Sequence, residues 1–178
     1  MKKSLIFTLV FTALLSFNNL NAQVKNTEEN ISAVKRQINK TIGKWHKAAA
    51  AANFDDYFNL MTEDAIFIGT DATENWTLPE FKKFSKPYFD AGKAWNFSTL
   101  ERNLYVHENI RVAWFDELLD TQMGICRGSG VLMKENGKWK IHHYVLSIAV
   151  PNENVDELTL MKKDFDEKLI KKLKRKQK

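Results

Sequence analysis

Two adjacent histidines, His142 and His143, stand in the segment GKWKIHHYVLS near the end of the chain. Imidazole side chains bind metal ions and transfer protons near neutral pH, so the pair raises the question of a metal site or an acid/base pair. The segment also has the pattern of a β-strand, in which neighbouring side chains point to opposite faces. The two rings then cannot bind one ion without distorting the strand. His46 and His107 lie far away without ligand spacing around them, and we expect no metal site.

The neighbours of the pair indicate which histidine faces the interior. Trp139 and Ile141 favour burial, and they share a face with His143. Lys140 favours water and shares the other face with His142. We therefore predict that His143 points inward and that His142 lies outside or at an interface. An inward His143 is either a polar group of a ligand site or a histidine that only packs in the core.

Two adjacent carboxylates, Asp116 and Glu117, pose the same question in the segment VAWFDELLD. On a strand they also face opposite ways, and each face carries an aromatic residue as well, Trp114 on one and Phe115 on the other. A carboxylate in an apolar interior would have a raised pKa and could act as a general base. The pattern does not decide which one is buried, and we favour the alternative that both lie at a solvated rim.

The N-terminal residues have the pattern of a secretory signal peptide. Met1-Lys2-Lys3 is followed by an apolar run from Leu5 to Leu15 and a polar segment that ends at Ala22. The run is shorter than the roughly 20 residues that a membrane-spanning helix needs. We predict cleavage after Ala22, so that the mature protein is exported to the periplasm or secreted as a soluble domain.

The net charge of +5 is unevenly distributed along the chain. Residues 162–178 carry nine Lys and Arg against three Asp and Glu, whereas residues 23–161 have a net charge of −3. An acidic body with a basic tail lacks the basic face of a nucleic-acid-binding domain, so we expect no nucleic-acid partner. The single cysteine, Cys126, excludes an intrachain disulfide, and its apolar and Gly neighbours favour a buried core residue.

Helical periodicity dominates the first half of the mature chain, and a period of two dominates the second half. We expect helices over about 28–52, 54–61 and 77–92, with one strand at 65–69. Four strands should follow, over about 95–107, 110–120, 123–135 and 138–149, and a last amphipathic helix over 155–173. Thr77 and Glu80 predict the cap of the third helix, and Asn136-Gly137 predicts a two-residue hairpin turn.

This order of elements predicts an α+β domain. A curved antiparallel sheet must wrap around helices segregated to one side, which leaves a cone with an open mouth. Such a cavity is a natural ligand site.

Five motifs then carry a resemblance to a known family. They are AIFIGTDATENWT, KPYFDAGKAWNF, VAWFDELLD, CRGSGVLMKENGKWKIHHYVLS and VPNE, and they span Ala65 to Glu153. With them the chain resembles the SnoaL-like branch of the nuclear transport factor 2-like superfamily. The resemblance implies a cone-shaped α+β fold and a homodimer through the outer sheet face. It does not imply one activity, because isomerases, cyclases, dehydratases and proteins without known chemistry share the fold.

The expected domains are a signal peptide (residues 1–22), a SnoaL-like cone domain (23–151) and a basic amphipathic C-terminal helix (152–178). The tail helix is compatible with contact to an anionic membrane surface. We favour the interpretation that it is a solvated helix end, and we expect no membrane contact.

Arg127 could add a cation to the cone if its strand places it on the inner face. A two-residue turn would pair Glu135 with Lys138 and put Arg127 outside, whereas a three-residue loop with a bulge at Gly137 would put it inside. The local sequence favours the tight turn, and the resemblance favours the inner face. We choose the inner face, where Arg127 would bind an acidic ligand or pair with a carboxylate of the neighbouring strand.

The predicted pocket combines aromatic walls with these polar groups. Its expected lining is Trp76, Tyr88, Trp95, Trp114, Arg127 and His143. We favour binding of a small, partly apolar molecule without catalysis and without a cofactor. One alternative is a cofactor-free isomerase, dehydratase or cyclase, in which His143 and Asp116 or Glu117 act as acid and base. The other is a dimeric protein-interaction module.

Three structural outcomes would separate these hypotheses. A buried carboxylate within hydrogen-bond reach of His143, in an open pocket, would favour an enzyme. A pocket lined by aromatic rings without an ionisable pair would favour binding. A cone filled by side chains would contradict both.

Overall fold

The computed structural model describes residues 28–176, which fall into two compact units, one ending at Ser147 and one beginning at Ile148. The predicted signal peptide, residues 1–22, lies outside the described residues. Between residues 28 and 176 we find no helix with the length and apolar character needed to cross a membrane.

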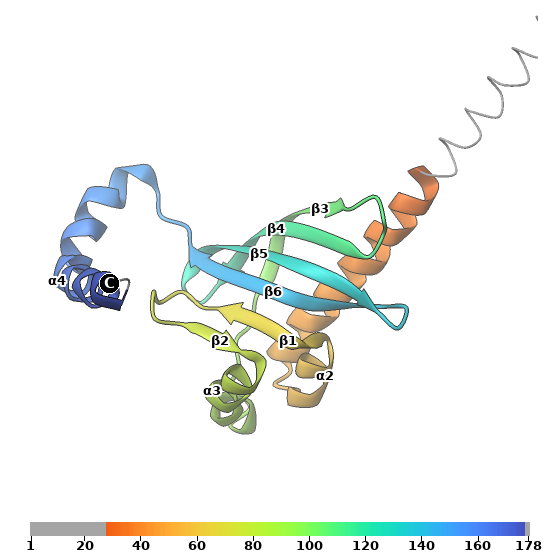
Figure 1. Ribbon diagram of the computed structural model, residues 1–178, viewed down its shortest axis with the longest axis horizontal. Helices are drawn as coiled ribbons and strands as arrows, with labels where there is room; N and C mark the ends of the chain where they lie inside the picture. Colours follow the sequence, from red (N-terminus) through yellow and green to blue (C-terminus); the bar gives the residue numbers. More distant parts are fainter. Residues whose placement is uncertain (1–27, 177–178) are drawn as a thin grey trace, which may run out of the picture. The chain divides into compact units, whose positions relative to one another are not determined.

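Helices precede most of the sheet in the first unit (Figure 1). The long N-terminal helix is described over residues 28–50 and is followed by α2 (Phe54–Asn59) and α3 (Leu78–Asp90). The strands are β1 (Met61–Ile68), β2 (Asn75–Thr77), β3 (Ser98–Val106), β4 (Val112–Thr121), β5 (Gly124–Glu135) and β6 (Lys138–Ile148). A short 3-10 helix (Asn152–Asn154) and α4 (Val155–Lys176) follow. The predicted order of elements is confirmed with two differences, since β1 begins four residues earlier than expected and the short strand β2 lies between β1 and α3.

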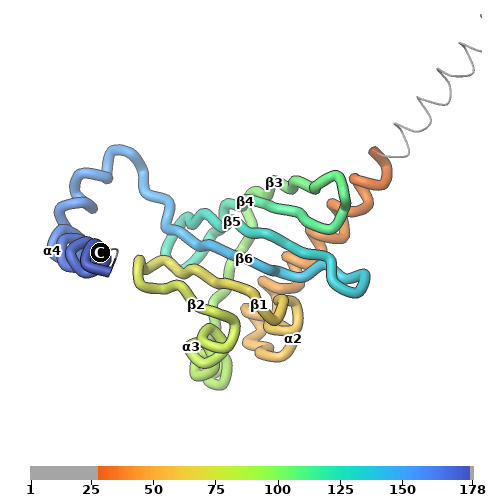
Figure 2. The backbone as a smooth tube through the Cα atoms, viewed as in Figure 1, coloured from red at the N-terminus to blue at the C-terminus, as the bar shows by residue number. Residues whose placement is uncertain are grey.

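All six strands belong to one sheet, in the order β2-β1-β6-β5-β4-β3. The strands of the pairs β1–β2, β3–β4 and β4–β5 are antiparallel, whereas β1 and β6 run parallel. Figure 2 shows β1 and β6 side by side, although α3 and four further strands separate them in the sequence. The predicted α+β fold, a curved and mostly antiparallel sheet with helices on one side, is confirmed.

Two local signals act as the sequence predicts. Glu80 accepts hydrogen bonds from the backbone N–H of Thr77 at 2.9 Å and from its hydroxyl at 2.7 Å, so the side chains at the start of α3 hold its first turn. Asn136 and Gly137 have φ angles of 48° and 79°. Positive φ at both central residues is what a two-residue hairpin turn requires, which confirms the tight turn between β5 and β6.

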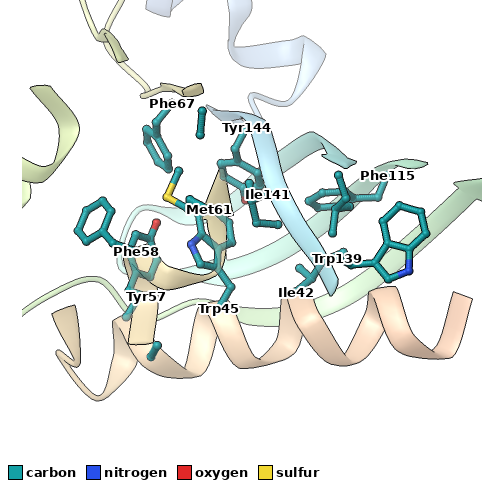
Figure 3. Packing of buried hydrophobic residues seen from close by; sticks show 14 of the residues in the cluster. Ile42, Trp45, Tyr57, Phe58, Met61, Phe67, Phe115, Trp139, Ile141 and Tyr144 are labelled. Atoms are coloured by element: carbon teal, nitrogen blue, oxygen red, sulfur yellow. The ribbon is translucent and has the colours of Figure 1, made fainter. Parts of the chain in front are cut away.

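The long N-terminal helix packs on the inner face of the sheet. Figure 3 shows Ile42 and Trp45 pointing from this helix toward the strands. The ring of Trp45 lies 4.8 Å from that of Tyr144 on β6 and stacks on Tyr57 of α2 at 4.9 Å. Burial of each large apolar side chain of this kind contributes roughly 1.5–3 kcal/mol. Cys126 is also buried, as predicted.

Inward and outward residues do not alternate strictly along β6, and this affects the faces on which His142 and His143 lie. Trp139 and Ile141 are buried, but the next buried residue is Tyr144, so His142 and His143 both lie between inward positions. Two consecutive residues of this kind are typical of a β-bulge. The prediction that His143 shares the inner face with Trp139 and Ile141 is therefore wrong, because the irregularity moves Tyr144 into that position.

Substitution of two glycines tests this packing, because we expect the two changes in the free energy of unfolding to have opposite signs. A methyl group at Gly43, in the long helix, would meet nothing within 4 Å, whereas at Gly130 it would lie 2.6 Å from the His143 carbonyl oxygen. Gly43→Ala should raise the free energy of unfolding by about 0.5–1 kcal/mol, because Ala has the higher helix propensity. Gly130→Ala should lower it by about 1–3 kcal/mol through overpacking. Urea unfolding followed by circular dichroism measures both, and a stabilising Gly130→Ala would contradict the approach of β5 to β6.

Candidate functional site

Strand β4 places one of the two predicted carboxylates in the core. Phe115, Glu117 and Leu119 are buried, and Glu117 is 0% exposed. Asp116 lies on the outer face, where its Oδ1 accepts a hydrogen bond from Asn103 Nδ2 at 3.1 Å. The expectation that both carboxylates lie at a solvated rim is therefore wrong for Glu117.

Three side chains from three elements surround the Glu117 carboxylate. His46 of the long helix places Nε2 2.8 Å from Oε1, and the Tyr144 hydroxyl of β6 donates to the same oxygen at 3.0 Å. Arg102 of β3 donates from Nε and Nη2 to Oε2, at 2.9 and 2.5 Å. Both oxygens of the carboxylate are thus occupied by two interactions each. We call these four residues the Glu117 cluster.

Arg102 contacts Glu117 because the register of β3 against β4 places the two residues directly opposite each other. The pairing of β3 with β4 shifts between Thr99 and Glu101, and beyond the shift Arg102 lies opposite Glu117. Two further guanidinium hydrogens have partners, because Nη1 donates to Asn39 Oδ1 at 2.7 Å and Nη2 to Thr99 Oγ1 at 2.8 Å. The side chain of Arg102 is 7% exposed, so the ion pair with Glu117 is shielded from water.

The cluster holds Glu117 in its ionised form. Burial alone would raise the pKa of Glu117, but the hydrogen bond and charge of His46 and the charge of Arg102 outweigh it and lower the pKa below its usual value. Burial and the neighbouring Glu117 charge raise the pKa of Tyr144 well above its usual value, so its hydroxyl stays a donor. Because an ionised carboxylate only accepts, Nε2 of His46 must carry the hydrogen between them.

Gly128 of β5 provides the space that the cluster needs. A methyl carbon at this position would lie 2.2 Å from the Tyr144 hydroxyl oxygen and 3.0 Å from Cγ of Glu117. Contacts this short are not tolerated, so a side chain at position 128 would displace the tyrosine or the carboxylate. The Gly-rich segment CRGSGV therefore contributes to the cluster through Gly128, which leaves space for Tyr144 and Glu117, and not through Arg127.

The chemistry open to the Glu117 cluster follows from this arrangement. A carboxylate with a lowered pKa and four hydrogen-bonding interactions is a poor general base, so Glu117 is suited to orienting His46 and Tyr144. Across residues 28–176 we find no group of three or more His, Cys, Asp or Glu side chains that could hold a metal ion.

A separate groove lies along α3. It has a volume of about 500 Å³, which falls in the range of small-molecule sites. It is lined by Phe84, Tyr88, Lys93, Ala94, Trp95, Asn96 and Gln122, which we call the aromatic groove. Trp95 also packs against Phe81 and Tyr57, with ring centres 5.6 and 5.5 Å apart. This tryptophan therefore joins the groove to the core.

Aromatic rings fill the interior beside the groove. Phe67 stacks on Phe81 with ring centres 4.0 Å apart, and Phe67 also lies 5.5 Å from Tyr144 of the Glu117 cluster. Glu117 is fully buried and does not line the aromatic groove. A ligand in the groove would thus reach Trp95 but not the carboxylate.

The structure brings together only some of the predicted pocket residues. Tyr88 and Trp95 share the aromatic groove, and Trp76 stacks on Phe84 of the groove at 4.4 Å. His143 does not line it, and in the sheet it pairs with Ile66, which lies between the buried Ala65 and Phe67.

Trp114 and Arg127 also lie outside the groove. Trp114 is on the outer face with Asp116 and stacks on Tyr105, with ring centres 5.8 Å apart. The inner position predicted for Arg127 is wrong, because Cys126 and Gly128 are the buried residues of that part of β5 and Arg127 is exposed. The tight turn at Asn136-Gly137 had favoured this outer position.

Sequence reasoning missed His46, Arg102 and Tyr144. His46 follows Ile42 by four residues and precedes Ala49 by three, so a polar residue on the apolar side of the long helix was the available signal. Strict alternation along β6 would put Tyr144 on the outer face with His142, whereas the bulge puts it on the inner face. Arg102 lies on the inner face because the register of β3 against β4 shifts between Thr99 and Glu101, and the sequence has no clear signal for this shift.

Glu117→Gln tests the cluster, because it keeps the shape and removes the charge. At pH 7 it should lower the free energy of unfolding by about 3 kcal/mol, since a buried ion pair loses one partner. The pKa of Glu117 is lower in the folded protein. Its stabilising contribution is therefore complete above the usual glutamate pKa of about 4.3 and is lost as the pH falls through the folded value.

The difference between wild type and Glu117→Gln should accordingly shrink as the pH falls from 5 toward 2, as measured by urea unfolding. Asp116→Asn is the matched control on the outer face and should change stability by less than about 1 kcal/mol. A difference that persists undiminished at pH 2 would contradict an ionised Glu117 with a lowered pKa.

Solved structures with the same fold include proteins of distant sequence. An NTF2-like protein of unknown function from Pseudomonas putida KT2440 has a TM-score of 0.58 and 12% identity, and the match covers 69% of this chain and 92% of that one. The association domain of C. elegans CaMKII has a TM-score of 0.55 and 20% identity, over 66% and 97% of the two chains. An NTF2-like protein from Cytophaga hutchinsonii ATCC 33406 has a TM-score of 0.54 and 15% identity, over 65% and 98%.

At these identities the structural similarity establishes the fold alone. No curated protein sequence matches the chain. The sequence pattern of the SnoaL-like domain matches residues 38–151, which is more than half of the chain and runs from the long helix to the end of the sheet. The chain therefore belongs to the SnoaL-like domain family, with the nuclear transport factor 2-like fold.

Proposed function

We propose that this protein binds a small, partly apolar molecule in the aromatic groove. The observation that carries the proposal is the groove itself, which has a volume of about 500 Å³ and places aromatic rings beside a few polar groups. Flat apolar parts of a ligand would pack on Phe84, Tyr88 and Trp95. The ammonium of Lys93 and the side-chain amide of Asn96 would bind a carboxylate or another oxygen-bearing group.

Binding is favoured over catalysis because the groove lacks an ionisable pair. Lys93 is the one ionisable group of its lining besides the phenol of Tyr88, and no carboxylate faces it. The aromatic filling of the interior would contradict a ligand deep in the cone, so the proposed site lies at its edge. The proposed site therefore differs from the cone pocket expected from the sequence, but it still includes Tyr88 and Trp95.

A cofactor-free enzyme is the second candidate, and the buried His46–Glu117 pair is the observation that favours it. Glu117 would orient the imidazole, and His46 would exchange a proton with the substrate. The ring of Phe97 lies 5.9 Å from that of His46, edge to face. Substrate would need to displace this ring, so Phe97→Ala should expose the imidazole. A proton-transfer activity that His46→Gln abolishes and Phe97→Ala increases would support this candidate.

Tyr88→Ala tests the aromatic groove. Saturation-transfer NMR with a library of aromatic carboxylic acids should identify binders of the purified mature protein. Tyr88→Ala should weaken their binding about tenfold, which corresponds to the 1.4 kcal/mol expected for one stacked ring. Tyr105→Ala is the matched control, because Tyr105 is 44% exposed and Tyr88 48%, and Tyr105 does not line the groove. Equal loss in both variants, or no binder in the library, would contradict the proposed site.

We further propose that the protein acts after export, as a homodimer formed through the outer sheet face. The predicted signal peptide supports export. Tyr105 and Trp114 stack on this face and are each 44% exposed, which favours a partner surface. The association domain of C. elegans CaMKII has the same fold.

Trp114→Glu tests the proposed dimer surface. It should raise the dissociation constant measured by sedimentation velocity at least tenfold, because a buried unpaired charge is costly at an interface. Leu160→Glu introduces the same charge at a more exposed residue outside the sheet and should leave that constant unchanged. A sheet-face dimer is contradicted if both variants sediment like the wild type.

A further inference from the structure

Helix α4 carries an apolar stripe that is not buried within its own unit, residues 148–176. Its stripe residues recur at spacings of three and four, which places them along one side of the helix. They are Leu158, Met161, Phe165, Leu169 and Leu173. None is buried, and Met161 is 78% exposed. Because an amphipathic helix derives most of its stability from the packing of such a stripe, α4 requires an occupant for it.

The stripe is nearly symmetric about its central residue, Phe165. Met161 and Leu169 lie four residues to either side of it, and Leu158 and Leu173 lie seven and eight residues away. If two copies of α4 run antiparallel and cross at Phe165, Leu158 of each copy meets Leu173 of the other. Every apolar residue of the stripe then faces an apolar residue, so a second copy fits the whole stripe.

The charges of α4 select the antiparallel direction. Residues 155–167 carry five Asp and Glu against two Lys, whereas residues 168–176 carry six Lys and Arg and no acidic residue. Antiparallel pairing places the acidic half of one helix against the basic half of the other. Parallel pairing would place the basic half against its own copy and would be repelled.

An anionic membrane fits the stripe less well. It would attract residues 168–176 but repel the acidic half, which carries three of the five stripe residues. We infer that α4 is a self-association element, which pairs antiparallel with the α4 of a second copy of this chain. This interaction surface is distinct from the aromatic groove and from the outer sheet face.

Single cysteines test both the pairing and its direction in the full mature chain. Leu158→Cys and Leu173→Cys are purified separately, mixed and oxidised. Antiparallel pairing should produce the mixed disulfide between the two variants as the main dimer. Disulfides between identical variants should be rare, because positions 158 and 173 lie about 22 Å apart along the helix axis. The unsubstituted chain is the control, since its Cys126 is buried and should not cross-link.

A second experiment reverses the charges at the two ends of α4 and measures the yield of the mixed disulfide. Asp156→Lys with Glu157→Lys should reduce the mixed disulfide at least fivefold, and adding Lys174→Glu with Arg175→Glu to the same chains should restore it. The same cross-link is expected in chains that also carry Trp114→Glu, which separates this pairing from the sheet-face dimer. Disulfides between identical variants, or no cross-link with co-sedimentation on phosphatidylglycerol vesicles, would overturn the proposal. Loss of the cross-link in the Trp114→Glu chains would overturn it as well.

Discussion

The arrangement of the first unit depends on the interactions of one buried group, the carboxylate of Glu117. An ionised group without water costs several kcal/mol unless charges and hydrogen bonds replace its hydration. Here His46, Arg102 and Tyr144 replace it, and each comes from a different element. The long helix, β3 and β6 are therefore tied to one point of β4. Hydrophobic packing would tolerate small shifts of the helix on the sheet, whereas these directional contacts do not.

The same cluster bears on where the proposed ligand would bind. His46 of the long helix and Tyr144 of β6 face each other in the interior, and Phe81 of α3 stacks on Phe67 of β1. Packed side chains therefore surround Glu117, which is fully buried. Trp95 both packs on Phe81 and lines the aromatic groove, so the groove adjoins the packed interior. The cluster that stabilises the fold and the groove proposed to bind a ligand are thus neighbouring but separate parts of the molecule.

The fold was predictable because its signals are local. The cap at Thr77 and the turn at Asn136-Gly137 depend on residues within a few positions of one another, and both form as expected. The site was less predictable because it depends on contacts between distant elements. His46 and Glu117 are 71 residues apart, and no periodicity links them. One irregularity in β6 also exchanges the faces of His143 and Tyr144, since a shift of one residue reverses every side chain beyond it.

The two proposed self-association surfaces, the outer sheet face and the α4 stripe, would together constrain the assembly that the chain can form. An antiparallel helix pair has two-fold symmetry, and so does a dimer through a shared sheet face. If the two axes coincide, both surfaces join the same two protomers and strengthen each other through effective concentration. If the axes differ, each protomer binds two different neighbours, and the assembly closes only as a tetramer with perpendicular axes or grows without limit. If both proposed surfaces are used, the short segment between Ile148 and Val155, which connects the sheet to α4, would decide between these two outcomes.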